Sequence, residues 1–73
     1  MQHSRIALQF GAVIRRHRLL AKLSQEEFAD RCSLHRTYIG AIERGEKTVT
    51  IETARKLAEA LNVKLSELIV EIE

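Results

Sequence analysis

The feature that most constrains how this chain folds is the stretch LSQEEFADRCSLHRTYIGAIERG, from Leu23 to Gly45. Ser24 and Glu27 within it have the spacing of a capping box. In that motif the hydroxyl and the carboxylate each accept a hydrogen bond from an exposed backbone N–H at a helix start. A helix is therefore predicted to begin at Ser24. Glu27 also places negative charge on the first turn, where the helix dipole favours it.

Two apolar stripes of helical spacing divide this stretch into two short helices joined by a tight turn. The first stripe consists of Phe28, Ala29 and Cys32. The second stripe consists of Tyr38, Ile39 and Ile42. Ser33 and Leu34 interrupt the pattern between them, and Gly45 is a suitable left-handed stop after the second. Each helix should have roughly eight to ten residues, and the small Ala29 lets them cross closely.

Three further helices are predicted around this pair, so the fold class is all-α, a compact bundle of five helices. The first runs from about Ser4 to Leu20. Its inner side carries Ile6, Phe10, Val13, Ile14 and His17. Thr50 can cap a helix from Ile51 to about Leu61, which Asn62 closes. A last short helix is predicted from Leu65 to about Ile72, residues 65–72.

The outer face of the second helix of the central pair carries mostly hydrogen-bonding groups that a core does not need. Its residues are His35, Arg36, Thr37, Tyr38 and Ala41. Gly40 is predicted on the same exposed side, where it keeps side-chain bulk away. This face suits a polar partner.

The central stretch resembles the helix-turn-helix of Xre/Cro-type, phage-repressor-like regulators. The residues that carry the resemblance are Leu23-Ser24-Gln25-Glu26-Glu27, Ala29, Leu34, Ile39, Ile42 and Glu43-Arg44-Gly45. Within that family, LHRTYIGAIERG is most similar to the controller proteins of restriction–modification systems. The similarity extends over Phe10 to Leu68. It implies a lambda-repressor-like DNA-binding domain, a single domain spanning 1–73 with the helix-turn-helix at 24–44.

A helix presented by this motif lies in the DNA major groove, with its N-terminal residues against base edges. The resemblance therefore implies base contacts from His35, Arg36, Thr37, Tyr38 and Ala41. Arg36 can donate two hydrogen bonds to O6 and N7 of guanine, and Thr37 offers a hydroxyl and a methyl group. His35 and Tyr38 could reach either phosphates or bases.

Phosphate contacts should frame these base contacts. In the family, the residue after the capping serine and the residue before the closing glycine contact phosphate, which here implies Gln25 and Arg44. Arg15, Arg16 and Lys47 are further candidates from their charge. For these three, an ordinary solvated charge explains the sequence equally well.

The resemblance also implies a structural ion pair between Arg18 and Glu43, and a partly buried pair of this kind fixes helix orientation. The alternative is that both side chains are solvated. Lys22 and Ser33 stand where the family commonly has glycine. A left-handed backbone at Lys22 would cost roughly 1 kcal/mol relative to glycine.

The C-terminal helix has more apolar residues than one buried side needs. We expect a dimer interface there, formed by Leu65, Leu68, Ile69 and Ile72. The alternative is that all four pack onto the helix from Ile51 to Leu61. Regulators of this type gain affinity as two-fold dimers on half-sites about one helical turn apart.

Charge is distributed unevenly along the chain, although the net charge is only +2. Residues 1–47 hold nine basic and five acidic side chains, a charge of +4, whereas residues 48–73 hold three and five, a charge of −2. An electropositive half and an acidic half are typical of a DNA-binding module with a separate contact surface.

Several classes of function are disfavoured. A chain of 73 residues is small for an enzyme pocket, and no nucleophile–base arrangement occurs. The single Cys32 excludes an internal disulfide and a multi-cysteine zinc site and is expected in the core. We expect no metal and no cofactor. No apolar run approaches the ~20 residues of a membrane span, and no signal-peptide pattern occurs, so a soluble, cytoplasmic protein is expected.

The sequence therefore predicts a homodimeric, sequence-specific transcriptional regulator of controller type that binds double-stranded operator DNA, with RNA polymerase as a further candidate partner. A controller of this kind can activate at one operator occupancy and repress at another. A phage-type repressor and an antitoxin share the fold and remain alternatives, as does a protein-interaction module that does not bind DNA.

Overall fold

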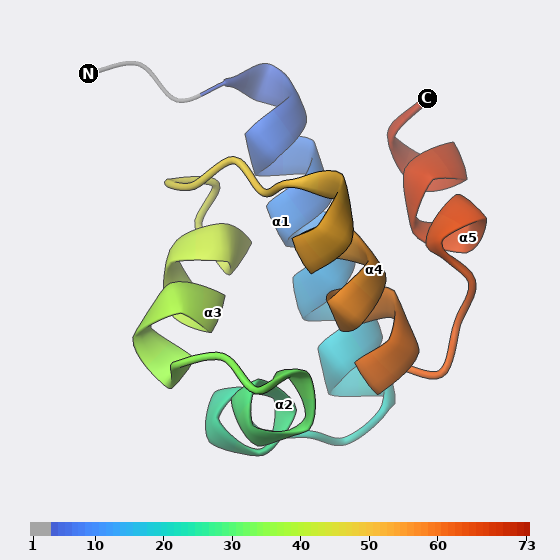
Figure 1. Ribbon diagram of the computed structural model, residues 1–73. Coiled ribbons are helices and arrows are strands. Elements are labelled where there is room, and N and C mark those ends of the chain that lie inside the picture. Colours follow the sequence, from blue (N-terminus) through green and yellow to red (C-terminus); the bar gives the residue numbers. More distant parts are fainter. Residues whose placement is uncertain (1–3) are drawn as a thin grey trace.

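Five α-helices follow one another in the computed structural model, which describes residues 4–73 (Figure 1). They are α1 (Arg5–Leu20), α2 (Gln25–Cys32), α3 (Arg36–Glu43), α4 (Ile51–Ala60) and α5 (Leu65–Ile69), followed by the 3-10 helix η1 (Val70–Ile72). No strand occurs in this part of the chain. The predicted all-α bundle of five helices is confirmed, while the first three residues of the predicted domain 1–73 lie outside the described residues.

Side-chain caps begin three of the helices where the sequence places them. The amide of Glu27 donates to Ser24 Oγ over 3.0 Å, and the amide of Ser24 donates to Glu27 Oε1 over 2.8 Å. The capping box is therefore complete, and its backbone hydrogen bond holds the pKa of Glu27 below its usual value. Ser4 and Thr50 cap α1 and α4 with their hydroxyls.

Three non-glycine residues end helices in the left-handed conformation. Lys22, Ser33 and Asn62 have φ angles of 59°, 57° and 59° and terminate α1, α2 and α4. A Cβ disfavours this region for all three, but the short polar side chain of asparagine makes it tolerated there, unlike lysine and serine. Lys22 and Ser33, which stand where the family commonly has glycine, thus adopt the left-handed backbone that glycine would adopt. Because they are not glycine, this backbone is strained at both positions.

Restoring glycine at these positions should stabilise the fold. We expect Ser33→Gly and Lys22→Gly each to raise the free energy of unfolding by about 0.5–1 kcal/mol, the steric relief being partly offset by greater freedom of the unfolded chain. Urea denaturation followed by circular dichroism measures the change. Ala12→Gly, at an exposed position inside α1, is the control and should lower it by about 1 kcal/mol. A loss of stability in both glycine variants would show that the left-handed backbone at these two positions is not strained.

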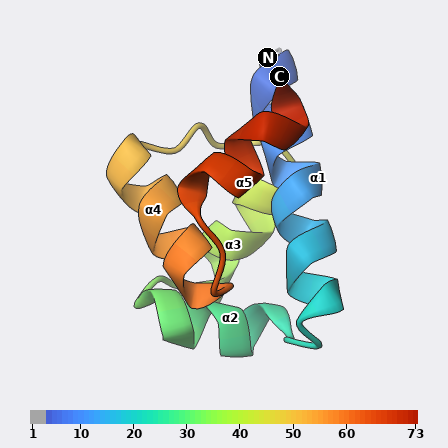
Figure 2. The ribbon, with the colours of Figure 1, turned by 90° about the vertical axis from the view of Figure 1, so that its right-hand side faces the viewer.

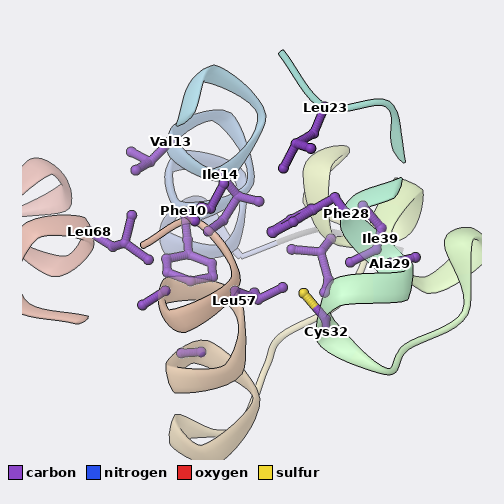
Figure 3. Close-up of a cluster of buried hydrophobic side chains, with 14 residues drawn as sticks. Phe10, Val13, Ile14, Leu23, Phe28, Ala29, Cys32, Ile39, Leu57 and Leu68 are labelled. Atoms are coloured by element: carbon purple, nitrogen blue, oxygen red, sulfur yellow. The ribbon is translucent and has the colours of Figure 1, made fainter. Parts of the chain in front are cut away.

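One core joins all five helices (Figure 3). Its largest fully buried side chains are Phe28, Ile14, Ile39, Ile42, Leu57 and Leu68. Cys32 belongs to this core as expected, and burial raises the pKa of its thiol to about 11. The helix-turn-helix is therefore held by α1 and α4 in addition to the contacts between α2 and α3.

Gly11 allows α1 and α3 to approach one another closely. A Cβ at this position would overlap the carbonyl oxygen of Ile42 and lie 2.9 Å from that of Glu43. Ala29, the small residue predicted to allow close helix crossing, is buried, whereas the close approach at Gly11 was not predicted. A glycine in the middle of a predicted helix was the available signal, because it is unfavourable there without a packing reason.

The C-terminal segment packs across α1 and α4 (Figure 2). Leu68 is fully buried within the chain, so the prediction that it lines a dimer interface is wrong. Glu71 pairs with Arg16 and lies 2.6 Å from Nε2 of His17, which fastens η1 to α1. None of the helices within residues 4–73 is long and apolar enough to cross a membrane.

Candidate nucleic-acid interface

The start of α3 presents three consecutive exposed side chains, those of His35, Arg36 and Thr37. His35 is the N-cap residue of the helix, and its Nδ1 accepts a hydrogen bond of 3.1 Å from the backbone N–H of Thr37. The cap holds the imidazole against the helix end, so His35 serves a local structural purpose that the sequence did not reveal. Arg36 and Thr37 project from a helix end fixed in this way.

The other two predicted base-contacting residues are less accessible. Tyr38 is half-buried and packs against the core. Ala41 is only 8% exposed. The structure therefore brings His35, Arg36 and Thr37 to one edge, leaves part of Tyr38 beside them, and gives Ala41 little surface for a base.

Gln25, Gly40 and Arg44 meet beside this edge. A Cβ on Gly40 would lie 3.1 Å from Nη1 of Arg44 and 3.6 Å from Oε1 of Gln25. Gly40 is buried, so the prediction that it lies on the exposed side is wrong: neighbouring side chains cover it. Its lack of a side chain lets the Arg44 guanidinium lie on the surface of α3. The two residues implied as phosphate contacts are thus neighbours, from the start of α2 and the end of α3.

Arg44 is held from its other side by Glu46. Its Nε donates to Oε2 over 2.9 Å and its Nη2 donates to Oε1 over 3.1 Å, with the Arg44 and Glu46 side chains 59% and 41% exposed. These hydrogen bonds raise the pKa of Arg44. The role of Glu46 was not predicted from the sequence, because a glutamate in a polar loop has no distinguishing pattern.

The buried ion pair implied by the resemblance is present in the structure. Arg18 Nε donates to Glu43 Oε2 over 2.6 Å, and Arg18 Nη2 donates to Glu43 Oε1 over 3.0 Å. Nη1 of Arg18 also donates to the carbonyl oxygen of Leu23, over 2.8 Å. Oε1 of Glu43 accepts a further hydrogen bond of 3.0 Å from the side-chain amide of Gln25. One carboxylate therefore ties α1 to α3 and orients Gln25.

The three less specific phosphate candidates do not form one cluster: Arg15 and Arg16 border the same hollow, whereas Lys47 lies elsewhere. Arg15 is exposed and borders a shallow hollow next to Glu43. Arg16 forms an ion pair with Glu71 and helps to hold the C-terminal segment, a structural role that was not predicted from the sequence. Lys47 borders an apolar hollow on another part of the surface, beside Ile6 and Ile51.

That apolar hollow lies between the start of α1, the start of α4 and the C-terminal segment. It has a volume of about 310 Å³ and includes Ile69 and Ile72 in its lining. Ile51 and Ile6 at its border are 77% and 58% exposed. Within residues 4–73 no group of three or more His, Cys, Asp or Glu side chains could hold a metal ion.

Comparison with known proteins identifies the same helix-turn-helix arrangement. The family model described as Helix-turn-helix matches residues 14–68, which include all of α2 and α3. The control protein C.BamHI of Bacillus amyloliquefaciens is 43% identical over 65 residues, which is 88% of this chain and 80% of that protein.

Solved structures give the same result. The restriction–modification controller protein C.AhdI of Aeromonas hydrophila superposes with a TM-score of 0.83 at 39% identity, covering 85% of this chain and 94% of that one. The controller protein C.Esp1396I, solved as a tetramer in complex with its natural 35 base-pair operator, gives a TM-score of 0.83 at 33% identity, covering 94% and 96%. The chain therefore belongs to the Xre-type helix-turn-helix family, and restriction–modification control proteins are among its relatives.

Proposed function

We propose that this chain is a sequence-specific transcriptional regulator of controller type that binds a two-fold DNA operator as a homodimer. The observation that carries the proposal is the exposed edge of His35, Arg36 and Thr37 at the start of α3, flanked by Gln25 and Arg44. A relative of the same fold has been solved on its operator. The relatives are transcription regulators rather than enzymes. We propose that this chain acts in the cytoplasm and that RNA polymerase is a further partner.

The side chains of this edge are suited to different tasks. Arg36 has a rigid fork of donors that matches O6 and N7 of guanine in the major groove, and Thr37 can place its hydroxyl or methyl group against a neighbouring base. Gln25 and Arg44 have the chemistry for phosphate oxygens, which position a protein on DNA without reading its sequence. Arg18 and Glu43 act at a distance, by fixing α3 and Gln25.

The apolar hollow is the best candidate surface for a second copy. With Leu68 excluded by its burial, the proposed interface consists of Ile69, Ile72, Ile6 and Ile51, which border the hollow. Leu65, the fourth predicted interface residue, lies outside the hollow and is partly buried against the core. An exposed apolar patch on a small domain commonly marks an interface. A single module buries only about 600–1,000 Å² on DNA, so pairing would add the affinity that one copy lacks.

Arg36→Ala should remove specificity more than binding. We expect the preference for the native base at one position of each half-site to fall by about 1–3 kcal/mol, whereas salt-sensitive binding to unrelated duplex should persist. Competition gel shifts with singly substituted operators measure this preference. Arg55→Ala, an exposed arginine on α4, is the matched control. Unchanged discrimination in the Arg36 variant would contradict the assignment.

A further inference from the structure

Arg44 and Glu46 form the ion pair that lies beside the proposed DNA-reading edge. We propose that the Glu46 carboxylate competes with DNA phosphate for the Arg44 guanidinium and so lowers the sequence-independent affinity of the chain for DNA. This inference rests on the proposed function, because it assumes that Arg44 faces the DNA backbone. It adds a residue that tunes binding without reading a base.

The two edges of the guanidinium are in different environments. Glu46 accepts two hydrogen bonds from the edge formed by Nε and Nη2, over 2.9 and 3.1 Å. Nη1, which belongs to the other edge, lies over Gly40, where even a Cβ would come within 3.1 Å of it. A phosphate group binds arginine most strongly through two parallel N–H donors on one edge. The edge that faces away from α3 is therefore the one that Glu46 already occupies.

A phosphate that takes this edge must displace a carboxylate with the same geometry and charge. The displacement is feasible because both side chains are substantially exposed, 59% for Arg44 and 41% for Glu46, and exposed ion pairs are weak. After displacement the Glu46 carboxylate stays two residues away along the chain and repels the phosphate. Phosphate contacts carry no base information, so this penalty applies equally to operator and unrelated DNA.

Such a penalty lowers the total affinity for DNA without changing the preference for the operator. Non-specific binding is supplied almost entirely by phosphate neutralisation. Glu46 cancels one of the positive charges that would contribute to it. The base contacts of Arg36 and Thr37 are unaffected, so the ratio of specific to non-specific affinity should not depend on Glu46.

The test is the variant Glu46→Gln, which keeps the size of the side chain and removes its charge. We expect its dissociation constant at low salt to fall about fivefold on both operator and unrelated duplex, the effect of one unit charge at about 4 Å in water. The salt dependence should become steeper by up to about one. Glu59→Gln is the matched control, because Glu59 forms an exposed pair with Arg55 on α4; its effect should be less than about twofold. Fluorescence anisotropy over a salt series measures both quantities.

Repeating the substitution without Arg44 separates competition from a general charge effect. In an Arg44→Ala background, Glu46→Gln should change affinity no more than Glu59→Gln does. An increase of the same size in both backgrounds, or weaker binding by Glu46→Gln alone, would overturn the inference while leaving the proposed function intact. If the unmodified chain binds no duplex DNA, the proposed function fails and the inference fails with it.

Discussion

Replacing Glu43 by Gln is expected to lower the free energy of unfolding by about 3–5 kcal/mol, because Arg18 would keep its charge in a buried site without an opposite charge. The two side chains are only 9% and 2% exposed, so water cannot replace the lost partner. The loss is a large part of the about 5–15 kcal/mol that stabilises a typical domain. Urea denaturation measures it, and Glu59→Gln, which neutralises an exposed pair, should change stability by less than about 1 kcal/mol.

The double variant Arg18→Met with Glu43→Leu separates the charge from the packing. Replacing a buried pair by apolar residues of similar volume is often neutral or stabilising, so the double variant should recover most of the stability lost in Glu43→Gln. It should nevertheless bind DNA less well, because Gln25 loses the carboxylate that orients it. A Glu43→Gln protein as stable as the unmodified chain would show that the pair does not hold α1 to α3.

Replacing Gly11 by Ala should be the second severe change, with an expected loss of about 3 kcal/mol. Glycine to alanine inside a helix normally stabilises by about 1 kcal/mol. Here the new methyl group would meet backbone oxygens of Ile42 and Glu43, which cannot rotate away as a side chain can. The helices α1 and α3 would have to separate, and the Arg18–Glu43 pair would open with them.

Gly40→Ala is the matched control for this prediction. Its methyl group would meet only side-chain ends, those of Arg44 at 3.1 Å and of Gln25 at 3.6 Å, and no backbone atom outside α3 comes as close. We therefore expect Gly40→Ala to keep or slightly raise stability, by up to about 1 kcal/mol. Equal melting temperatures for Gly11→Ala and the unmodified protein would contradict the close contact between α1 and α3.

Local signals in the sequence predicted the helices well. The capping box at Ser24, the cap at Thr50 and the helix end at Asn62 depend on residues close in the chain, and each is present. The pair of Arg18 and Glu43 was accessible only through the family resemblance, because the two residues are 25 positions apart.

Contacts between distant segments account for what the sequence did not predict. Helical spacing identified the C-terminal apolar residues, but it could not show that Leu68 would be buried by α1 and α4 while Ile69 stayed 40% exposed. In the sequence, Arg16 cannot be told from a free surface charge, because its partner Glu71 lies far along the chain and is brought beside it only by the fold. The cover over Gly40 likewise depends on two side chains that meet only in the fold.

The central claim is that α3 reads a two-fold operator as part of a homodimer. Nuclease protection of the DNA upstream of the chain's own gene tests it most directly. We predict two protected half-sites of related sequence, in inverted orientation and about one helical turn apart. Uniform protection along the fragment, or no protection at concentrations that saturate non-specific binding, would contradict the claim.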